Sequence, residues 1–145
     1  ASALADMRLP NDPHVIVSIH NYAPFKFTHQ GAAWIDPPLP VGVTCCDAAQ
    51  RAEMLLPLDT AKRWSESNRY PIFVGEFGAY EKADMAARVR FTQMMREETE
   101  SRGFSWAYWE LAAGFGVYDP DAKAFRKPLL EALIPSGQTN GRSSP

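Results

Sequence analysis

Hydrophobic and polar residues are patterned along the chain in a way that predicts three short strands. Residues 71–78 are apolar apart from one carboxylate, end at a glycine and are too short for a helix, which is typical of a buried strand. Residues 14–20 are rich in β-branched side chains, and residues 104–110 are rich in aromatic ones. Both compositions favour strands.

Helical spacing of apolar residues predicts three helices between and after these strands. Residues 57–68 have Pro57 near their start, where a helix tolerates proline. Residues 82–102 are the longest helical segment and stop before Gly103. A last short helix is predicted at residues 127–134.

Strands that alternate with helices run parallel, with right-handed crossovers, so the sequence predicts an α/β fold. A loop rich in proline and aromatic residues follows the first strand, and loops of that length in compact domains are usually functional or disordered. Its aromatic content argues against disorder. Three parallel strands leave two open edges, whose unpaired backbone groups invite pairing with further strands.

The length of 145 residues suits a single domain. We expect residues 1–135 to form this domain and the low-complexity residues 136–145 to be a flexible tail. With 15 basic and 17 acidic residues, the chain gives no electrostatic reason to bind nucleic acid or an anionic membrane. No apolar run reaches the roughly 18 residues that a membrane span needs, and the first residues lack the features of a signal peptide.

The cysteines and histidines do not predict a metal site. Cys45 and Cys46 are adjacent, so they lack metal-site spacing, and neighbouring cysteines rarely meet disulfide geometry. His14, His20 and His29 match no compact ligand motif. We therefore expect no metal.

Glu76 closes the predicted strand at residues 71–78. A carboxylate at the end of an apolar strand is costly unless it is paired, hydrogen-bonded or used in chemistry. Alternation along the strand places it on one face with Ile72 and Val74. An ordinary strand-end glutamate, neutralised by an arginine or lysine of a loop, is the alternative interpretation.

The carboxyl ends of the three predicted strands bring further reactive side chains to the edge of the sheet that carries Glu76. His20 and Tyr22 share a face at the end of the first strand, and Trp109 ends the third. In parallel α/β proteins, catalytic and binding residues are concentrated at this end of the strands. A phenol or imidazole beside a carboxylate favours its ionised form, which is a competent nucleophile toward an anomeric carbon. Trp109 is placed to form the floor of a sugar subsite, on which a sugar ring can stack.

Four segments form a recognisable series along the chain. They are SIHNYAPF at residues 18–25, THQGAAW at 28–34, VGEFGAY at 74–80 and WAYWE at 106–110. In this order they resemble glycoside hydrolase family 5, the family of retaining endoglucanases and mannanases. The resemblance extends over nearly all of residues 1–135.

The resemblance implies that Glu76 is the catalytic nucleophile at the end of barrel strand seven. It also implies that His20 and Tyr22, on strand six, contact the substrate or the nucleophile. Family members are eight-stranded (β/α) barrels of the TIM type that need no metal or organic cofactor. The residues that the resemblance assigns to substrate binding are Trp109, which would stack a sugar beside the cleavage point, and also Trp34 and His29.

The chain departs from the family pattern at the acid/base residue. In the family this glutamate follows an asparagine at the end of strand four, as Asn-Glu-Pro, and no Asn-Glu occurs here. A complete barrel takes about 250 residues. We therefore expect the C-terminal part of a barrel, with strands six to eight, that carries the nucleophile without the acid/base.

The other carboxylates are poor substitutes for that acid/base, which must lie about 5–5.5 Å from the nucleophile. Glu110 adjoins Trp109, so alternation points it away from the sugar face and toward a helix or loop. Asp36, Asp119 and Asp121 lie in loops of unpredictable reach. We expect the chain alone to lose most of the roughly 10²–10⁴-fold that general-acid catalysis contributes.

The resemblance thus predicts a C-terminal fragment of a retaining endo-β-1,4-glucanase, a cellulase, acting on a β-glucan oligosaccharide or polysaccharide. β-Mannan is the alternative substrate, and a non-catalytic carbohydrate-binding or self-assembling barrel fragment is the alternative function. A third alternative is an inert truncation product. The open strand edges predict association with copies of the chain or with an N-terminal barrel complement. An extracellular location follows from a polymer that is too large to enter a cell.

Overall fold

The computed structural model describes residues 2–136, so residues 137–145 of the predicted tail lie outside the described range. The three predicted strands and three predicted helices are present, with a short antiparallel pair before the last helix. The elements are η1 (Ser2–Asp6), β1 (Val17–His20), α1 (Phe25–Thr28), α2 (Ala48–Asn68), β2 (Ile72–Glu76), α3 (Met85–Ser101), β3 (Ser105–Trp106), β4 (Tyr118–Asp119), β5 (Ala124–Phe125) and α4 (Lys127–Leu133).

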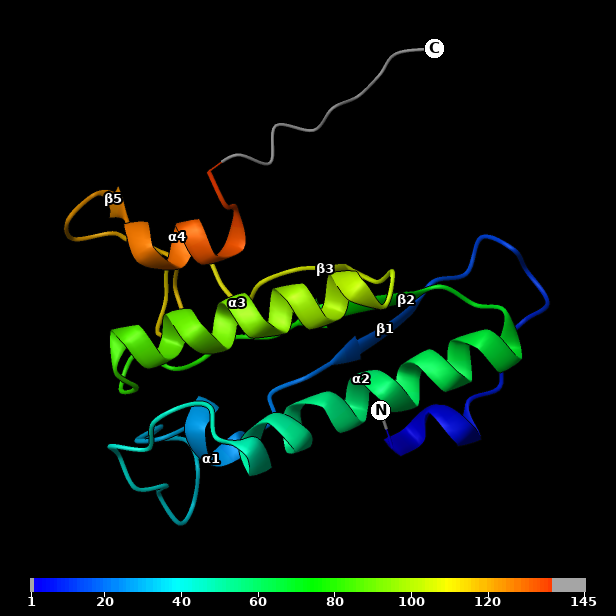
Figure 1. Cartoon of the computed structure of the whole chain (residues 1–145), viewed down its shortest axis with the longest axis horizontal. Helices are drawn as coiled ribbons and strands as arrows, with labels where there is room; N and C mark the ends of the chain where they lie inside the picture. The colour runs from blue at the N-terminus through cyan, green and yellow to red at the C-terminus, as the bar shows by residue number, and fades with distance from the viewer. Residues whose placement is uncertain (1, 137–145) are drawn as a thin grey trace.

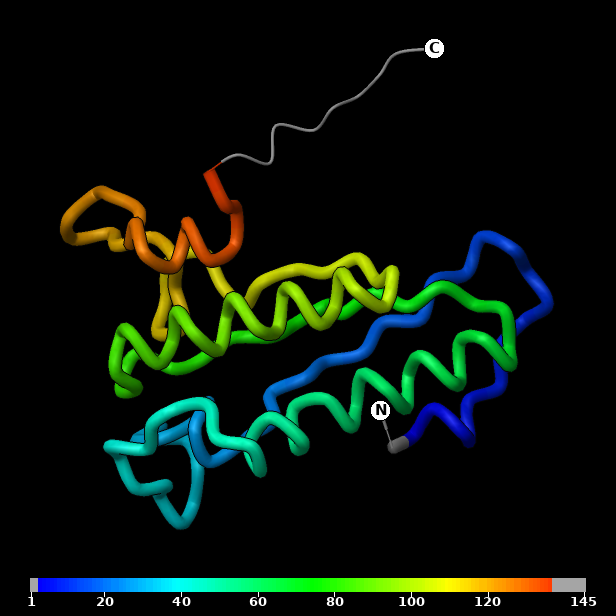
Figure 2. Tube along the Cα trace, in the orientation of Figure 1, coloured from blue at the N-terminus to red at the C-terminus, as the bar shows by residue number. Residues whose placement is uncertain are grey.

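β1, β2 and β3 form a parallel sheet in that spatial order, which confirms the predicted α/β topology. α2 connects β1 to β2, α3 connects β2 to β3, and both helices lie on the same side of the sheet (Figure 1). The chain trace shows η1 lying beside α2, so the beginning and the middle of the chain pack together (Figure 2).

The hydrophobic core lies between α2, α3 and the face of the sheet that they cover. Val17 and Ile19 of β1 and Ile72 and Val74 of β2 point into it and are buried. The buried helix side chains of the same core are Met54, Leu58, Ala61, Ala87, Phe91 and Met95. Because apolar burial is the main source of stability, this contact fixes where the strands end relative to the helices.

The start of α2 corrects the sequence prediction. The helix begins at Ala48 rather than at Pro57, which lies inside it. Asp47 and Gln50 form a capping box: the Asp47 carboxylate accepts from the Gln50 N–H and the Gln50 side chain accepts from the Asp47 N–H, both at 2.8 Å. This cap satisfies two backbone donors and sets the start of the helix ahead of the proline.

Three further details differ from the prediction. β1 begins at Val17 rather than at residue 14, and β3 is limited to Ser105–Trp106 because the next residues leave regular pairing. The hairpin of β4 and β5 lies in what the sequence predicted as a loop. A disulfide joins Cys45 and Cys46, although the adjacency of the two residues argued against one.

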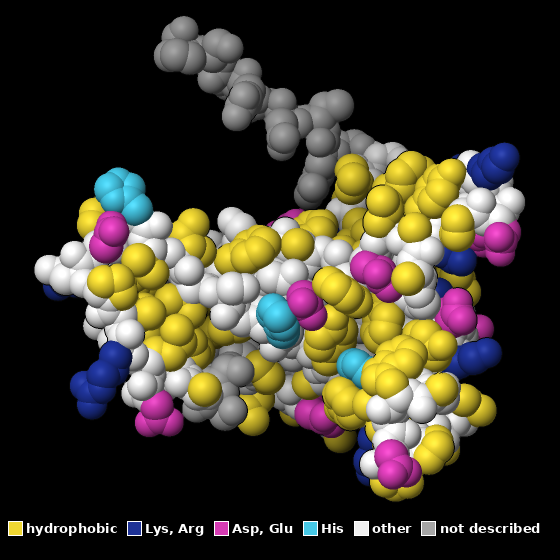
Figure 3. All heavy atoms as spheres, turned by 180° about the vertical axis from the view of Figure 1, so that it is seen from behind, with side chains coloured by type: hydrophobic (Ala, Val, Ile, Leu, Met, Phe, Trp, Pro, Cys, Tyr) yellow, Lys and Arg dark blue, Asp and Glu magenta, His cyan; other side chains and the backbone are white. Residues whose placement is uncertain are grey.

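The opposite face of the sheet is not covered by a helix within residues 2–136. Ile16 is 62% exposed on this side, and Ser18 and His20 are also exposed. Figure 3 views the molecule from this side and shows hydrophobic side chains gathered at its surface. A hollow of about 380 Å³ is lined by Ile16, Ser18, Pro71, Ile72, Phe73 and Ser105.

Of the helices that the structure describes, none combines the length and apolarity needed to cross a membrane.

Candidate active site

A β-bulge at the end of β2 aims Glu76 into the site. Val17 to Ile19 pair residue by residue with Ile72 to Val74, but His20 pairs with Glu76, so Gly75 is the extra residue on β2. A Cβ on Gly75 would collide with the Ser18 hydroxyl, which explains the glycine. Bulges of this kind redirect side chains beside functional sites.

The bulge corrects the predicted orientation of Glu76. Alternation placed its side chain on the face of Ile72 and Val74, which is the buried core face. The structure instead turns the carboxylate toward His20 and Tyr22. The extra residue shifts the period of the strand by one and moves the side chain to the other face.

His20, Tyr22 and Glu76 meet at one carboxylate oxygen. The Tyr22 hydroxyl donates to Oε2 of Glu76 at 2.9 Å, and Nδ1 of His20 lies 3.3 Å from the same oxygen. The Glu76 side chain is 25% exposed, so a ligand can reach it. Burial, followed by the hydrogen bond and charge of Glu76, raises the pKa of Tyr22, which keeps its hydroxyl a neutral donor.

The contacts of Glu76 do not support the alternative of a strand-end glutamate neutralised by an arginine or lysine. Among the ion pairs of the described residues, the partner of Glu76 is His20. In the same part of the chain no cluster of histidine, cysteine and acidic side chains could hold a metal ion. His14 instead contacts Asp12 at 3.0 Å, ahead of the start of β1 at Val17.

Aromatic rings form a wall beside Tyr22. His29 is buried, its ring stacks on Phe25 with centroids 4.1 Å apart, and its edge meets Tyr22 at 5.0 Å. Burial lowers the pKa of His29, so the ring is neutral. Trp34 is 57% exposed and lies against His29 with centroids 6.5 Å apart. Of the two predicted substrate-binding residues in this loop, Trp34 is accessible and His29 lies behind the aromatic surface.

Trp109 lies next to the residues that follow Glu76. Its backbone N–H donates to the carbonyl of Phe77 at 2.9 Å, and its side chain is 43% exposed. Its carbonyl oxygen occupies the space that a Cβ on Gly78 would need. The end of β2 is therefore fitted closely against the segment after β3, and the indole is exposed.

Glu110 is bonded to a loop, which agrees with one part of the sequence prediction. Its Oε1 accepts from the backbone N–H of Phe115 at 3.4 Å, a long hydrogen bond. Because Phe115 in turn packs on Tyr22, the Glu110 carboxylate lies near the candidate site, and its predicted orientation away from the sugar face is not confirmed. Asp119 is used structurally, since it accepts from backbone groups of its own turn and pairs with Arg126.

Phe115 is a site residue that the sequence analysis did not single out. Its ring meets Tyr22 at 6.0 Å and His29 at 5.5 Å, and it also contacts Trp34 and Tyr80. The Tyr108 hydroxyl and the Arg88 guanidinium both donate to its carbonyl, at 2.8 and 3.0 Å. A phenylalanine in a glycine-bearing loop gives no sequence signal of this placement, because the loop path decides it.

The carboxylate of Glu76, held by a phenol and an imidazole, thus lies at the end of a parallel strand. The model of the cellulase family, glycosyl hydrolase family 5, matches residues 1–114. The chain belongs to glycosyl hydrolase family 5. This confirms the family resemblance and assigns the chain to the glycoside hydrolases.

Sequence relatives of this family 5 chain are bacterial endoglucanases. Endoglucanase H of Acetivibrio thermocellus is 26% identical over 142 residues, which cover 94% of this chain and 15% of that protein. Cellulase/esterase CelE of the same organism is 30% identical over 127 residues, which cover 85% of this chain and 14% of that protein. The chain therefore spans a small part of the length of these relatives.

Solved structures similar to the family 5 chain include endoglucanases. One endoglucanase has a TM-score of 0.87 and 44% identity, covering 93% of this chain and 44% of that structure. Thermotoga maritima Cel5A in complex with cellobiose has a TM-score of 0.86 and 42% identity, covering 92% of this chain and 44% of that structure. The fold is therefore that of a partial (β/α) barrel of the TIM type, with β1, β2 and β3 as strands six to eight.

Proposed function

We propose that the chain supplies the nucleophile of a retaining β-glycoside hydrolase, an endo-β-1,4-glucanase or cellulase. The observation that carries the proposal is the convergence of the Tyr22 hydroxyl and the His20 imidazole on Oε2 of Glu76. These contacts orient the carboxylate, and its second oxygen attacks the anomeric carbon as the bond to the departing oxygen breaks. A covalent glycosyl-enzyme results, and water then releases the sugar.

The acid/base of this reaction is proposed to come from outside residues 1–145. Such a residue protonates the departing oxygen and then activates the water, and it must lie about 5–5.5 Å from Glu76. Glu110 is engaged with the Phe115 backbone, and Asp119 with its own turn and Arg126. Without the acid, we expect a loss of roughly 10²–10⁴-fold in rate.

A β-glucan is the proposed substrate, with β-mannan as the alternative. The relatives named endoglucanase support β-glucan. The solved complexes of Thermotoga maritima Cel5A with cellobiose and with mannotriose are consistent with either substrate. Trp109 and Trp34 are exposed aromatic planes on which sugar rings can stack, and His29 supports Trp34 from behind. A polymeric substrate places the intact enzyme outside the cell.

The proposed partner of the sheet is either a second copy of the chain or an N-terminal barrel complement. β1 and β3 are the outer strands, and their free edges can pair with further strands. The exposed hydrophobic side chains of the uncovered face support such an association, because parallel sheets are normally covered on both faces. Light scattering tests the association of copies, which a concentration-independent monomer mass would exclude.

The test of the proposed function uses an aryl β-cellobioside with an activated phenol, which departs without a proton donor, to measure hydrolysis by the wild-type chain and by Glu76→Gln. Binding is measured with cello-oligosaccharides. We expect hydrolysis to disappear in Glu76→Gln while binding persists. Glu66→Gln, which changes an exposed glutamate of α2 paired with Lys62, is the matched control and should retain hydrolysis. Hydrolysis that survives in Glu76→Gln contradicts the proposal.

The alternative function, a non-catalytic carbohydrate-binding module, is favoured by the two exposed tryptophans. It predicts binding that neither the wild-type chain nor Glu76→Gln converts to hydrolysis, together with weaker binding by Trp109→Ala. A chain that neither binds nor hydrolyses these sugars would match an inert fragment.

A further inference from the structure

Asn21 lies between the two residues that contact Glu76, yet its side chain points the other way. His20 and Tyr22 reach the carboxylate, whereas Asn21 is only 2% exposed and enters the core between α2 and α3. A buried carboxamide is costly unless its donors and acceptors are matched. Its partners therefore show what this residue holds together.

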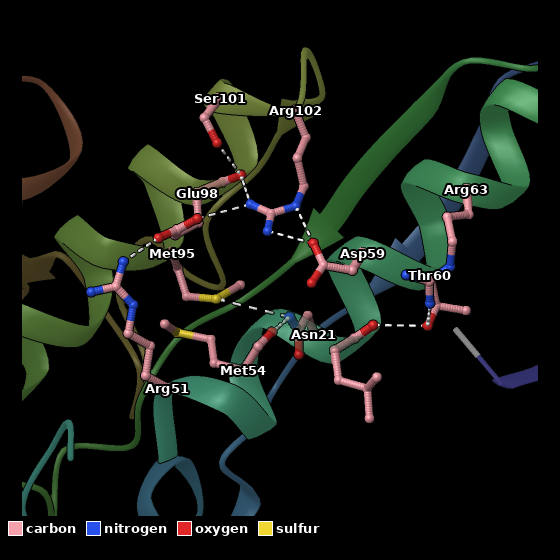
Figure 4. Close-up of polar contacts among 11 residues, drawn as sticks. Asn21, Arg51, Met54, Asp59, Thr60, Arg63, Met95, Glu98, Ser101 and Arg102 are labelled. Atoms are coloured by element: carbon pink, nitrogen blue, oxygen red, sulfur yellow. Dashed lines mark hydrogen bonds and ion pairs between the residues drawn. The ribbon is translucent and has the colours of Figure 1, made fainter. Parts of the chain in front are cut away.

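The contacts of Asn21 join four separate segments. Its Nδ2 donates to the Met54 carbonyl of α2 at 3.0 Å and lies 3.9 Å from Sδ of Met95 in α3 (Figure 4). Its Oδ1 accepts from the Ala23 N–H at 3.1 Å, and its own N–H donates to the Glu76 carbonyl at 3.0 Å. The end of β1 is thereby tied to both helices and to the end of β2.

These contacts act on the backbone that carries the two orienting side chains. The bond from the Ala23 N–H to Oδ1 closes a turn around Tyr22, and asparagine favours such turns. The bond from Asn21 Nδ2 to Met54 sets the position of this turn relative to α2. A displacement of about 1 Å in a catalytic group can reduce the rate by about 10²-fold, so this setting matters for the contact with Glu76.

We propose that Asn21 is a positioning residue, which holds His20 and Tyr22 against Glu76 by anchoring the segment after β1 to α2 and α3. The proposal rests on the function proposed above. It assigns no contact with substrate to Asn21, whose side chain lies on the core side of the sheet.

The test compares Asn21→Ala with Arg102→Met. Asn21→Ala removes the three side-chain contacts of Asn21. Arg102→Met breaks contacts of Arg102 with Asp59 of α2 and Glu98 of α3, in the same helix pair but without a contact to the site (Figure 4). The control therefore loosens the two helices and leaves the turn after β1 intact.

The decisive readout is the ionisation of Tyr22, followed by NMR of tyrosine labelled with carbon-13 at Cζ and assigned with Tyr22→Phe. Burial is the main cause of the raised pKa of this phenol, and the charges of Glu76, Glu110 and Tyr108 add to it. We expect Asn21→Ala to ionise Tyr22 at a lower pH than the wild type, closer to the ordinary value of about 10. Arg102→Met should ionise it at the wild-type pH.

Hydrolysis gives a second readout: we expect kcat to fall at least about tenfold in Asn21→Ala, with KM changed less. An unchanged Tyr22 ionisation in Asn21→Ala overturns the proposal, whatever the loss of thermal stability. If Asn21→Ala does not fold, Asn21→Ser takes its place. The serine hydroxyl can replace the contact with the Ala23 N–H but not the contacts with Met54 and Met95, so an unchanged Tyr22 ionisation in Asn21→Ser overturns the proposal as well. A wild-type chain that does not cleave the aryl β-cellobioside sinks the proposed function, whereas the Tyr22 titration still decides the role of Asn21.

Discussion

The hydroxyl of Tyr22 donates to Oε2 of Glu76 at 2.9 Å, across the gap between the ends of two neighbouring strands. The burial of Tyr22 and this bond raise the pKa of the phenol, so it keeps its proton when the carboxylate is charged. The contact therefore works in one direction only: Tyr22 gives a hydrogen bond and Glu76 receives it. Two predictions follow from this direction.

Tyr22→Phe should reduce hydrolysis of cello-oligosaccharides by about 10- to 100-fold, since a hydrogen bond to a charged group contributes about 1.5–3 kcal/mol. Steady-state kcat/KM is the measurement. Tyr70→Phe is the matched control, because the Tyr70 hydroxyl donates to the Pro10 carbonyl far from the site. Equal activity in Tyr22→Phe and the wild type would contradict the role given to the phenol.

The stability of the chain in alkali should depend on Tyr22. Its pKa is higher in the folded than in the unfolded chain, so its contribution is complete below about pH 10 and is lost as the pH rises further. We expect the free energy of unfolding to fall by up to about 1.4 kcal/mol per pH unit in this range, and less steeply in Tyr22→Phe. Urea denaturation between about pH 9 and 11 measures both slopes; parallel slopes would argue against the raised pKa.

The bulge predicts a specific rescue. In Gly75→Ala the new methyl group meets the Ser18 hydroxyl, so we expect a loss of about 1–3 kcal/mol in stability, as overpacking costs. Ser18→Ala removes that oxygen and should restore most of the loss in the double variant, since the remaining neighbours allow ordinary contacts. Denaturant unfolding of the four proteins completes the cycle. Additive effects would show that the collision is not what demands glycine.

The ion pairs between α2 and α3 predict an acid-dependent contribution to stability. Hydrogen bonding to Arg102 is the main cause of the lowered pKa of Glu98, so this contribution is present above about pH 4.3 and is lost as the pH falls through the folded value. Arg102→Met should cost about 1–3 kcal/mol at neutral pH and less near pH 3. Urea unfolding at both pH values is the check, and a pH-independent cost would refute it.

Much of the fold was predictable because it rests on periodicity. The boundaries of α3 and α4 agree closely with the predicted residues 82–102 and 127–134, since Gly103 and Pro128 mark an end and a start. α2 was predicted too short because Pro57 looked like a first-turn proline, while the capping pair Asp47 and Gln50 stood further upstream. Packing decides whether a helix continues through a proline, and a single sequence does not reveal that packing.

The grouping of three side chains at the candidate site was predictable, but its geometry and its aromatic surroundings were not. His20, Tyr22 and Glu76 could be grouped because strand ends of a parallel sheet meet at one edge. The bulge at Gly75 was not predicted, because one glycine does not distinguish an extra residue from a regular one. The positions of the Asn21 and Phe115 side chains depend on the paths of loops and helices. The local pattern of hydrophobic and polar residues does not determine these paths.

The positions of His20 and Tyr22 relative to Glu76 are set by contacts among β1, β2, α2 and α3, which all lie within residues 17–101. These three side chains can therefore be moved between barrels as one continuous piece of chain. A chimera that joins residues 1–135 to the first half of another family 5 barrel would bring His20, Tyr22 and Glu76 already in contact, and its new contacts would lie at the seam between the halves.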